Sequence, residues 1–368
     1  MTEPQLYVGL MTGTSLDGID AVLADFAAER PRLRAHVRHG LADDLRAALL
    51  ALNRPGENEL HRAAVAAQHL ARAYAAAVGD LLLGAKVEAG AVRAIGAHGQ
   101  TVRHRPESGY TIQINAPATL AELTGIDVVA DFRARDVAAG GQGAPLVPAF
   151  HAAVFRAETP RAVVNVGGIS NLTGLSAAGV ASPPLGFDCG PGNVLLDAWA
   201  QEHLGEPVDR DGHWAAGGQV QAELLAALLD EPYFSLPPPK STGRDRFDRH
   251  WLAGKLQGRR IDARDVQATL TRLTAEVVAR DIGRHFPEAA DVVVCGGGAY
   301  NTALMRMLGE VCAPRPVLAS DALGVPADQV EAFAFAWLAR EFIAGRCANV
   351  PAVTGARGPR RLGALYPR

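Results

Sequence analysis

The chain has 368 residues, of which 48% are hydrophobic and 20% charged, and these proportions exclude a disordered polypeptide. The formal net charge is −3, so the chain lacks the basic excess that marks proteins binding nucleic acid or a membrane surface. A chain of this length is expected to form two domains or one large one.

The cysteines and the N-terminal segment indicate the cellular compartment. Cys189, Cys295, Cys312 and Cys347 show no CxxC spacing, which argues against a zinc site. Four cysteines in a chain of this length do not make a disulfide scaffold, and a reducing compartment fits them. The N-terminus lacks the basic and apolar regions of a signal peptide, and no stretch predicts a membrane span. We therefore expect a cytoplasmic protein with no membrane partner.

The first part of the chain predicts a meander of strands followed by helices and shorter strands. Apolar runs predict strands over 5–11, 21–26 and, more weakly, 32–38, joined by tight turns. The other elements expected in this part are helices over 43–50, 59–83 and 117–124 and strands over 92–97, 111–114 and 127–130.

The second part begins in the same way, with a strand, a glycine-rich turn and another strand, over 161–166 and 172–175. The elements expected after it are helices over 193–203, 218–229, 262–285 and 328–343, a proline-rich connection over 231–245 and a strand over 291–295. Strands that alternate with helices predict an α/β fold with mainly parallel central strands. The similar beginnings of the two parts suggest an internal duplication.

Glycine-rich turns follow predicted strands at three places: MTGTSLDGID at 11–20, NVGGISNLT at 165–173 and VCGGGAYN at 294–301. Glycine lets backbone amides approach a ligand closely, and threonine and serine hydroxyls add donors, so such turns suit phosphate oxygens. A tight hairpin or helix entry without a ligand is the alternative for each turn, and the presence of three makes it less favoured. None matches the P-loop pattern, and GGGAY is a poor match to the dinucleotide-binding pattern.

Several carboxylates lie in or near segments with unusual local sequence. Asp188, in GFDCGPGN, lies between glycine and proline and next to Phe187, which favours a raised pKa and a role as general base. An Asx turn or a helix cap is the alternative for Asp188. Asp17 and Asp20, in the first glycine-rich turn, can either hold Mg²⁺ or stabilise the turn. Glu331, in a helix with an apolar face, is either a site residue or a solvated one.

Basic residues also follow predicted strands. His98, in AHGQT, is either a ligand-binding or a structural histidine. Arg133 and Arg135, in ADFRARD, can clamp a carboxylate, and an ion pair with a neighbouring aspartate is the alternative. Lys240, one of only three lysines, is interpreted as a surface residue.

Together these segments resemble the anhydro-N-acetylmuramic acid kinases, from about residue 5 to the end. The matching segments, in family order, are MTGTSLDGID, AHGQTVRH, QINAPATLAELTGIDVVADFRARDVAAGGQGAPLVPAFH, NVGGISNLT, GFDCGPGN, PPPKSTGRD, CGGGAYN and the AFAFAWLA helix. The resemblance implies a two-lobed actin-like ATPase fold, with a ribonuclease-H-like mixed sheet flanked by helices in each lobe and ATP in the cleft between them. The expected lobes are 1–132 with a C-terminal return over 345–368, and 133–344. A homodimer is also implied.

The activity implied is an ATP-dependent opening of the 1,6-anhydro ring of 1,6-anhydro-N-acetylmuramic acid with phosphorylation of O6. The products are N-acetylmuramic acid 6-phosphate and ADP, and the step serves peptidoglycan recycling and amino-sugar catabolism. Asp188 matches the family base and would take a proton from the water that attacks C1. Glu331 matches a family glutamate near the sugar. Another sugar or acid kinase of the same superfold and a non-catalytic ATP-dependent switch are the rival interpretations.

The resemblance also assigns substrate contacts. Arg133 is the candidate for the lactyl carboxylate, with Arg135 two residues away, and Ser170 and His98 are weaker sugar contacts. Cys189, beside the expected base, occupies a position where threonine is usual. A thiol is a poorer hydrogen-bond partner than a hydroxyl. Activity would therefore fall if that hydroxyl orients the base or contacts phosphate, and would not change if only its size matters.

The glycine-rich turns are assigned to ATP and Mg²⁺ on the same basis. The first two would bind phosphates and the third the nucleoside end, with Mg²⁺ held by Asp17 and Asp20. The residues expected to contact the cofactors are Gly13, Thr14, Ser15, Leu16, Asp17, Gly18, Ile19, Asp20, Gly167, Gly168, Asn171, Gly296, Gly297, Gly298 and Asn301.

Overall fold

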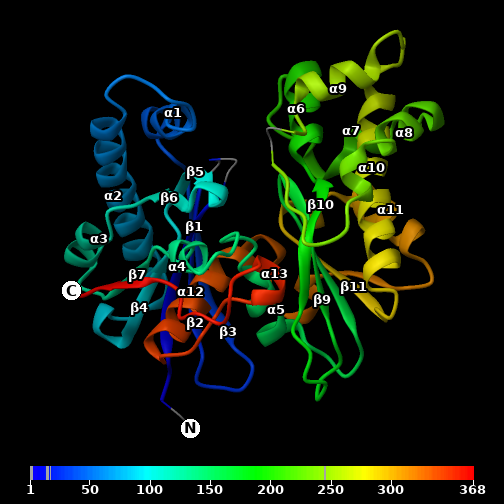
Figure 1. The fold of residues 1–368 in the computed structure, drawn as a ribbon. Helices are drawn as coiled ribbons and strands as arrows, with labels where there is room; N and C mark the ends of the chain where they lie inside the picture. The colour runs from blue at the N-terminus through cyan, green and yellow to red at the C-terminus, as the bar shows by residue number, and fades with distance from the viewer. Residues whose placement is uncertain (1–2, 14–15, 17, 244–245) are drawn as a thin grey trace. The chain divides into compact units, whose positions relative to one another are not determined.

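The computed structural model describes residues 3–13, 16, 18–243 and 246–368, and the chain divides into two compact units. Unit 1 contains residues 1–150 and 329–368, and unit 2 contains residues 151–328. Both ends of the colour scale in Figure 1 belong to unit 1, since the chain returns to it after unit 2. The lobe limits expected from the sequence, 132 and 344, stay predictions. Within the described ranges, no helix is both long and apolar enough to span a bilayer.

Unit 1 is built on a mixed sheet of six strands (Figure 1). In sheet order these are β13 (Ala364–Tyr366), β7 (Val128–Ala130), β4 (Val92–Ala97), β1 (Leu6–Thr12), β2 (Ile19–Asp25) and β3 (Arg32–His39). The strands β1, β2 and β3 form an antiparallel meander, whereas β4 and β7 run parallel to β1. Apolar side chains of β1, β2 and β4 and of helix α2 (Glu59–Ala85) form the main hydrophobic core of this unit.

The other elements of unit 1 flank this sheet. They are α1 (Asp43–Ala51), the hairpin β5 (Gln100–Arg105) and β6 (Tyr110–Ile114), α3 (Pro117–Thr124), α4 (Ala134–Ala138), α12 (Val330–Ile343) and α13 (Pro351–Thr354). Helix α5 (Val147–Phe155) crosses the boundary between the units. Helix α2 packs against β2 and β3, and α12 packs against β1, β2 and β4.

Two paired glycines let helix α12 lie directly on this sheet. Gly9 of β1 and Gly96 of β4 are register partners. A Cβ atom on Gly9 would collide with the carbonyl oxygen of Ala332, and one on Gly96 would collide with that of Phe335. The backbone of α12 therefore touches the backbone of the sheet, which fixes the helix whose first turn carries Glu331.

Unit 2 repeats the strand order of unit 1 in a sheet of five strands. In sheet order these are β10 (Leu185–Pro191), β9 (Ile169–Leu175), β8 (Arg161–Val166), β11 (Asp291–Cys295) and β12 (Val317–Ala319). Again the first three strands form an antiparallel meander, and the last two run parallel to the first. The predicted fold class is therefore confirmed: two mixed sheets with parallel central strands, flanked by helices.

The helices of unit 2 are α6 (Val194–His203), α7 (His213–Ala216), α8 (Ala222–Leu229), α9 (Arg249–Leu256), α10 (Ala263–His285) and α11 (Thr302–Cys312). Helix α10 packs against β9 and β10. The elements expected from the sequence do not include β5, β10, α5, α9, α11 or β12. In particular, no strand is expected around Asp188, whereas the segment is a strand because it pairs with β9 despite its glycines and proline.

Candidate active site

Asp188 lies on the edge strand β10, opposite Asn171 of β9. The register shifts between Asp188 and Gly190, so Cys189 is the additional residue of a β-bulge. Bulges occur often beside active sites because they change the direction of a side chain. The Asx-turn and helix-cap interpretations of Asp188 are wrong, because Asp188 is a strand residue and the N-cap of α6 is Asn193.

Three polar contacts fix Asp188. Its Oδ2 atom accepts a hydrogen bond from the amide of Thr242 at 3.1 Å. Its own amide donates to the carbonyl of Lys240 at 3.1 Å, and its carbonyl accepts from the Tyr233 hydroxyl at 2.8 Å. Burial raises the pKa of Asp188 to about 6, although the Thr242 amide and the charge of Lys240 act in the opposite direction. Such a carboxylate is mostly ionised at neutral pH but basic enough to accept a proton.

A buried ion pair lies next to Asp188. The Nζ atom of Lys240 is 3.0 Å from Oδ2 of Asp281 on α10, and the two side chains are only 2% and 3% exposed. The same ammonium lies 5.4 Å from the ring centroid of Phe187 and 5.1 Å from that of Tyr233. The interpretation of Lys240 as a surface residue is therefore wrong, because its stem is enclosed between β10 and α10.

Cys189 belongs to this buried group. Its side chain is fully buried, and its thiol interacts with the carboxylate of Asp281. Burial, followed by the charge of Asp281, raises the pKa of the Cys189 thiol well above its usual value. The thiol is thus coupled to the counter-ion of Lys240 and, more weakly, to the Asp188 carboxylate itself.

The second glycine-rich turn joins β8 to β9 and packs on the start of helix α6. The carbonyl of Gly167 accepts from the amide of Asn193 at 2.8 Å, and the carbonyl of Gly168 accepts from those of Gly192 and Val194 at 2.9 and 3.1 Å. In a trans peptide the N–H points away from the C=O. The amides that follow these carbonyls, those of Gly168 and Ile169, therefore point away from α6, as donors for an anion would.

The third glycine-rich turn packs against the end of β8, beside the second one. Gly296 has φ +80°, and a Cβ atom there would lie 2.7 Å from the carbonyl oxygen of Val166. A Cβ atom on Gly298 would strike the side chain of Val166. Gly297 lies between these two glycines in the same turn. The side chain of Asn301 caps α11 by accepting from the amide of Leu304 at 2.9 Å, so it already has a structural role.

The first glycine-rich turn, between β1 and β2, is only partly described. Thr14, Ser15 and Asp17 lie outside the described residues. The amide of Leu16 donates to the carbonyl of Gly13 at 3.1 Å, and Leu16 has φ +54° with its side chain buried. A non-glycine residue in this region of backbone space is strained, and such strain often occurs at ligand-binding turns.

The rest of this turn leads into β2. A Cβ atom on Gly18 would lie 2.8 Å from the carbonyl oxygen of His39, so the turn lies close to the end of β3. Ile19 is fully buried as the first residue of β2. The next residue, Asp20, contacts His36 Nε2 through its Oδ1 atom at 3.0 Å. Within the ranges that the structure describes, no group of three or more histidine, cysteine or acidic side chains can hold a metal ion.

His98, Arg133 and Glu331 all belong to unit 1, and the structure brings them together. Nε of Arg133 donates to Nε2 of His98 at 3.2 Å, and Nη1 donates to the carbonyl of Gly143 at 2.9 Å. Burial lowers the pKa of Arg133, and the charge of Glu331 opposes this shift. Burial, and then the charge of Arg133, lowers the pKa of His98 well below its usual value, so the ring is a neutral acceptor.

Arg135 and Ser170 lie elsewhere. Arg135 is exposed on α4, whereas Arg133 is half-buried and held by His98. Ser170 is buried in unit 2, where its hydroxyl contacts the carbonyl of Pro191 at 3.5 Å. Asp136 does not pair with Arg133. Its carboxylate instead accepts hydrogen bonds from the Gly143 amide at 2.8 Å and from the Asn349 and Thr354 side chains at 2.7 and 2.8 Å.

A group of polar side chains on and next to the β5–β6 hairpin is not among the predicted site residues. In the part of the chain that the structure describes, Oε1 of Gln100 and of Gln113 and both amide atoms of Asn115 are buried without a hydrogen-bond partner. Buried polar atoms are rarely left unpaired unless a ligand or water binds them. Asn115 directly follows β6 in the quoted segment QINAP, and a polar residue directly after a strand was the available signal.

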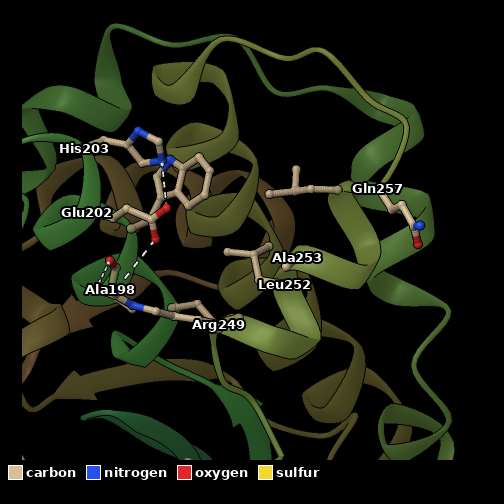
Figure 2. Close-up of a pocket in the computed structure, with 10 residues that line it drawn as sticks. Ala198, Glu202, His203, Arg249, Leu252, Ala253 and Gln257 are labelled. Atoms are coloured by element: carbon tan, nitrogen blue, oxygen red, sulfur yellow. Dashed lines mark hydrogen bonds and ion pairs between the residues drawn. The ribbon is translucent and has the colours of Figure 1, made fainter.

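A separate cavity of about 310 Å³ lies in unit 2 between α6 and α9 (Figure 2). Its walls are mostly apolar, with Trp199 and Leu252 among them. Glu202 at its rim faces Arg249 at 3.8 Å and His203 at 4.0 Å. None of the predicted site residues that the structure describes lines this cavity, so it is distinct from the candidate active site.

A family model and curated relatives match this chain over nearly its whole length. The family model described as "Anhydro-N-acetylmuramic acid kinase" matches residues 5–368. An anhydro-N-acetylmuramic acid kinase of Bordetella petrii is 62% identical over 371 residues, covering 100% of this chain and 97% of its own. One of Paraburkholderia xenovorans is 57% identical, with 99% and 98% covered. Among solved structures, component A of (R)-2-hydroxyglutaryl-CoA dehydratase from Acidaminococcus fermentans covers 90% of this chain and 96% of its own, at 13% identity. Its TM-score of 0.49 is too low to bear on the fold.

Proposed function

The chain belongs to the anhydro-N-acetylmuramic acid kinase family, and we propose that Asp188 activates the water that opens the anhydro ring. The enzyme is an ATP-dependent kinase of amino-sugar and cell-wall recycling. The observation that carries the proposal is the Asp188 carboxylate, held by the Thr242 amide at 3.1 Å, with a pKa that burial raises to about 6.

The proposed reaction couples the opening of the anhydro ring to the transfer of a phosphoryl group. Water attacks C1 of 1,6-anhydro-N-acetylmuramic acid and loses a proton to the Asp188 carboxylate. The bond between C1 and O6 breaks, and O6 receives the γ-phosphoryl group of ATP rather than a proton. The products are N-acetylmuramic acid 6-phosphate and ADP. Positioning and neutralisation of charge are expected to lower most of the barrier.

The glycine-rich turns fit a bound nucleotide. The outward amides of Gly168 and Ile169 are donors for phosphate oxygens, and the adjacent turn at 296–298 is proposed for the nucleoside end. Mg²⁺ needs only one or two carboxylates in addition to phosphates and water. Asp17 and Asp20 are the proposed ligands, and Asp20 would have to exchange its contact with His36 for the ion. When bound, Mg²⁺ would neutralise phosphate charge.

Unit 1 is proposed to bind the muramic sugar. The Arg133 guanidinium, oriented by the neutral His98 ring and the Gly143 carbonyl, is suited to clamp the lactyl carboxylate. Glu331 is proposed to position the attacking water or a sugar hydroxyl. The unpartnered amide oxygen of Gln100 and the unpartnered amide group of Asn115 would bind further polar groups of the ligand. We also propose that the protein is a cytoplasmic homodimer, which light scattering of the purified protein tests.

The decisive experiment is turnover in ¹⁸O-labelled water with product analysis by mass spectrometry and NMR. The proposal requires the label at C1 and phosphate on O6. Label missing from C1 would rule out the mechanism even if ADP forms. Assays with hexoses, N-acetylmuramic acid and acetate test the rival that the chain is another kinase, since turnover of one of these without turnover of the anhydro sugar would favour it.

The Asp188→Asn variant tests the base directly. We expect turnover to fall to background while the affinity for ATP, measured by calorimetry, stays close to that of the wild type. The exposed Asp230→Asn in the same unit is the matched control and should leave turnover unchanged. A near-normal rate in Asp188→Asn would remove Asp188 as the base.

A further inference from the structure

The segment that orients Asp188 has no regular secondary structure, and one of its side chains forms a buried ion pair. Residues 240–242 run along the open edge of β10, where the Lys240 carbonyl accepts from the Asp188 amide and the Thr242 amide donates to the Asp188 carboxylate. Between them the Lys240 side chain reaches inward to Asp281 of α10. The ion pair thus ties the segment to the long helix of unit 2.

The composition of the chain makes this lysine informative. Lysine and arginine together number 36, and only three of these are lysines, so arginine supplies nearly all the positive charge. The space around Lys240 explains a lysine here, because its ammonium lies between two aromatic rings with centroids 5.4 and 5.1 Å away. A compact ammonium fits this space, whereas the larger planar guanidinium of arginine would have to displace a ring.

We propose that the buried Lys240–Asp281 ion pair is a positioning device for the base of the reaction, with Lys240 setting both the direction and the electrostatic environment of the Asp188 carboxylate. This inference rests on the proposed role of Asp188. Lys240 and Asp281 act through Asp188 and are positioning residues. Cys189, which interacts with Asp281, is the third member of the device.

Other titratable groups surround the ion pair and must be considered in any pH test. Nε2 of His285, one turn after Asp281 on α10, is 3.9 Å from its carboxylate, and the ring of His285 contacts Phe187. Arg246 lies over the Tyr233 ring at 5.2 Å. The charged and titratable groups that face Asp188 and its ion pair are Lys240, Asp281, His285, Cys189, Tyr233 and Arg246.

The test compares the pH dependence of kcat in two single variants that change the charge in opposite directions. Lys240→Met removes a positive charge that lowers the pKa of Asp188, so the acidic limb of the profile should move to higher pH. Asp281→Asn leaves the lysine charge unopposed, so the limb should move to lower pH. A residue with a merely structural role would lower kcat in both variants without moving the limb in opposite directions.

Further variants separate charge from folding and serve as controls. Lys240→Met combined with Asp281→Leu replaces the pair with apolar side chains, which is expected to restore the thermal midpoint because no unpaired charge stays buried. The acidic limb of the kcat profile of this double variant should nevertheless stay at higher pH than in the wild type. Lys240→Arg keeps the charge and should lower kcat because the segment is displaced. His285→Gln identifies any contribution of that histidine, and Lys255→Met is the matched lysine control with an unchanged profile.

Different results would overturn the role of Asp188 as base and the positioning role of the ion pair. If Asp188→Asn stays active, the proposed base is wrong and the positioning role falls with it. If Asp188→Asn is inactive but the single and double variants keep the wild-type limb, only the positioning role is overturned. If Lys240→Met does not fold, the double variant and Asp281→Asn still decide, because each predicts its own direction of shift.

Discussion

The two sheets have the same strand order but hold their site residues by different means. In unit 1 the paired strands β1 and β4 carry Gly9 opposite Gly96, and the backbone of α12 rests on them. In unit 2 the corresponding strands β8 and β11 pair valine with valine, as at Val164 and Val294, so no helix backbone can approach as closely there. The candidate base is instead held at the open edge of the sheet, by a segment tied to α10 through the ion pair.

This difference shows that a repeated fold does not imply a repeated way of fixing side chains. Glu331 is placed by close packing at the centre of a sheet, and Asp188 by polar contacts at the edge of one. Packing is insensitive to pH and salt, whereas a buried ion pair depends on the charge state of both partners. The two regions should therefore respond to different changes.

The largest effect is expected where a side chain is added between sheet and helix. Gly96→Ala should lower the free energy of unfolding by about 3 kcal/mol or more, since overpacking against backbone cannot relax easily. The thermal midpoint, measured by calorimetry, should fall by roughly 10 °C. Gly79→Ala, at an exposed position of α2 with open space around it, is the control and should be neutral or slightly stabilising. A wild-type midpoint for Gly96→Ala would disprove the close contact.

A smaller effect is expected at the substrate contacts of unit 1. Arg133→Lys loses the planar pair of donors, so kcat/KM for the anhydro sugar should fall about 10- to 100-fold, mostly through KM. Arg135→Ala should leave both constants unchanged. The assay should be repeated with 1,6-anhydro-N-acetylglucosamine, which lacks the lactyl group. If Arg133→Lys weakens both sugars equally, Arg133 does not recognise the lactyl carboxylate.

The smallest effect concerns stability in acid, where the units should behave alike. Burial lowers the pKa of His151 in unit 2 to about 3 and that of His98 in unit 1 well below its usual value. In the unfolded chain each histidine has a pKa of about 6.5, so below that pH the unfolded state binds protons that the folded state does not. Stability is therefore lost as the pH falls from about 6.5 toward the folded pKa.

The variant His151→Gln tests this. It should reduce the stability lost between neutral pH and pH 5.5, measured by urea unfolding, by about 1 kcal/mol. The glutamine keeps a partner for the Thr173 hydroxyl, which contacts Nδ1 of His151 at 2.9 Å. Acid sensitivity identical to that of the wild type would show that His151 is not held neutral by burial.

The sequence predicts the central strands and the glycine-rich turns well because local pattern determines both. The run of valines over 161–166 and the glycines after it leave few alternatives. It fails at β10, where GFDCGP has low strand propensity and only pairing with β9 makes it a strand. It also fails at Lys240, because its partner Asp281 lies on a distant helix and nothing in the local sequence indicates the pairing.

One consequence of the chain order concerns synthesis on the ribosome. Strands β1 and β4 of unit 1 are made early, but α12, which covers them, is made only after the whole of unit 2. Unit 2 is one continuous stretch and can fold as it emerges, contrary to the usual N-terminal-first order. Until α12 has been made, the first sheet therefore exposes an apolar face to water. This makes the growing chain a candidate for chaperone binding before the enzyme is complete.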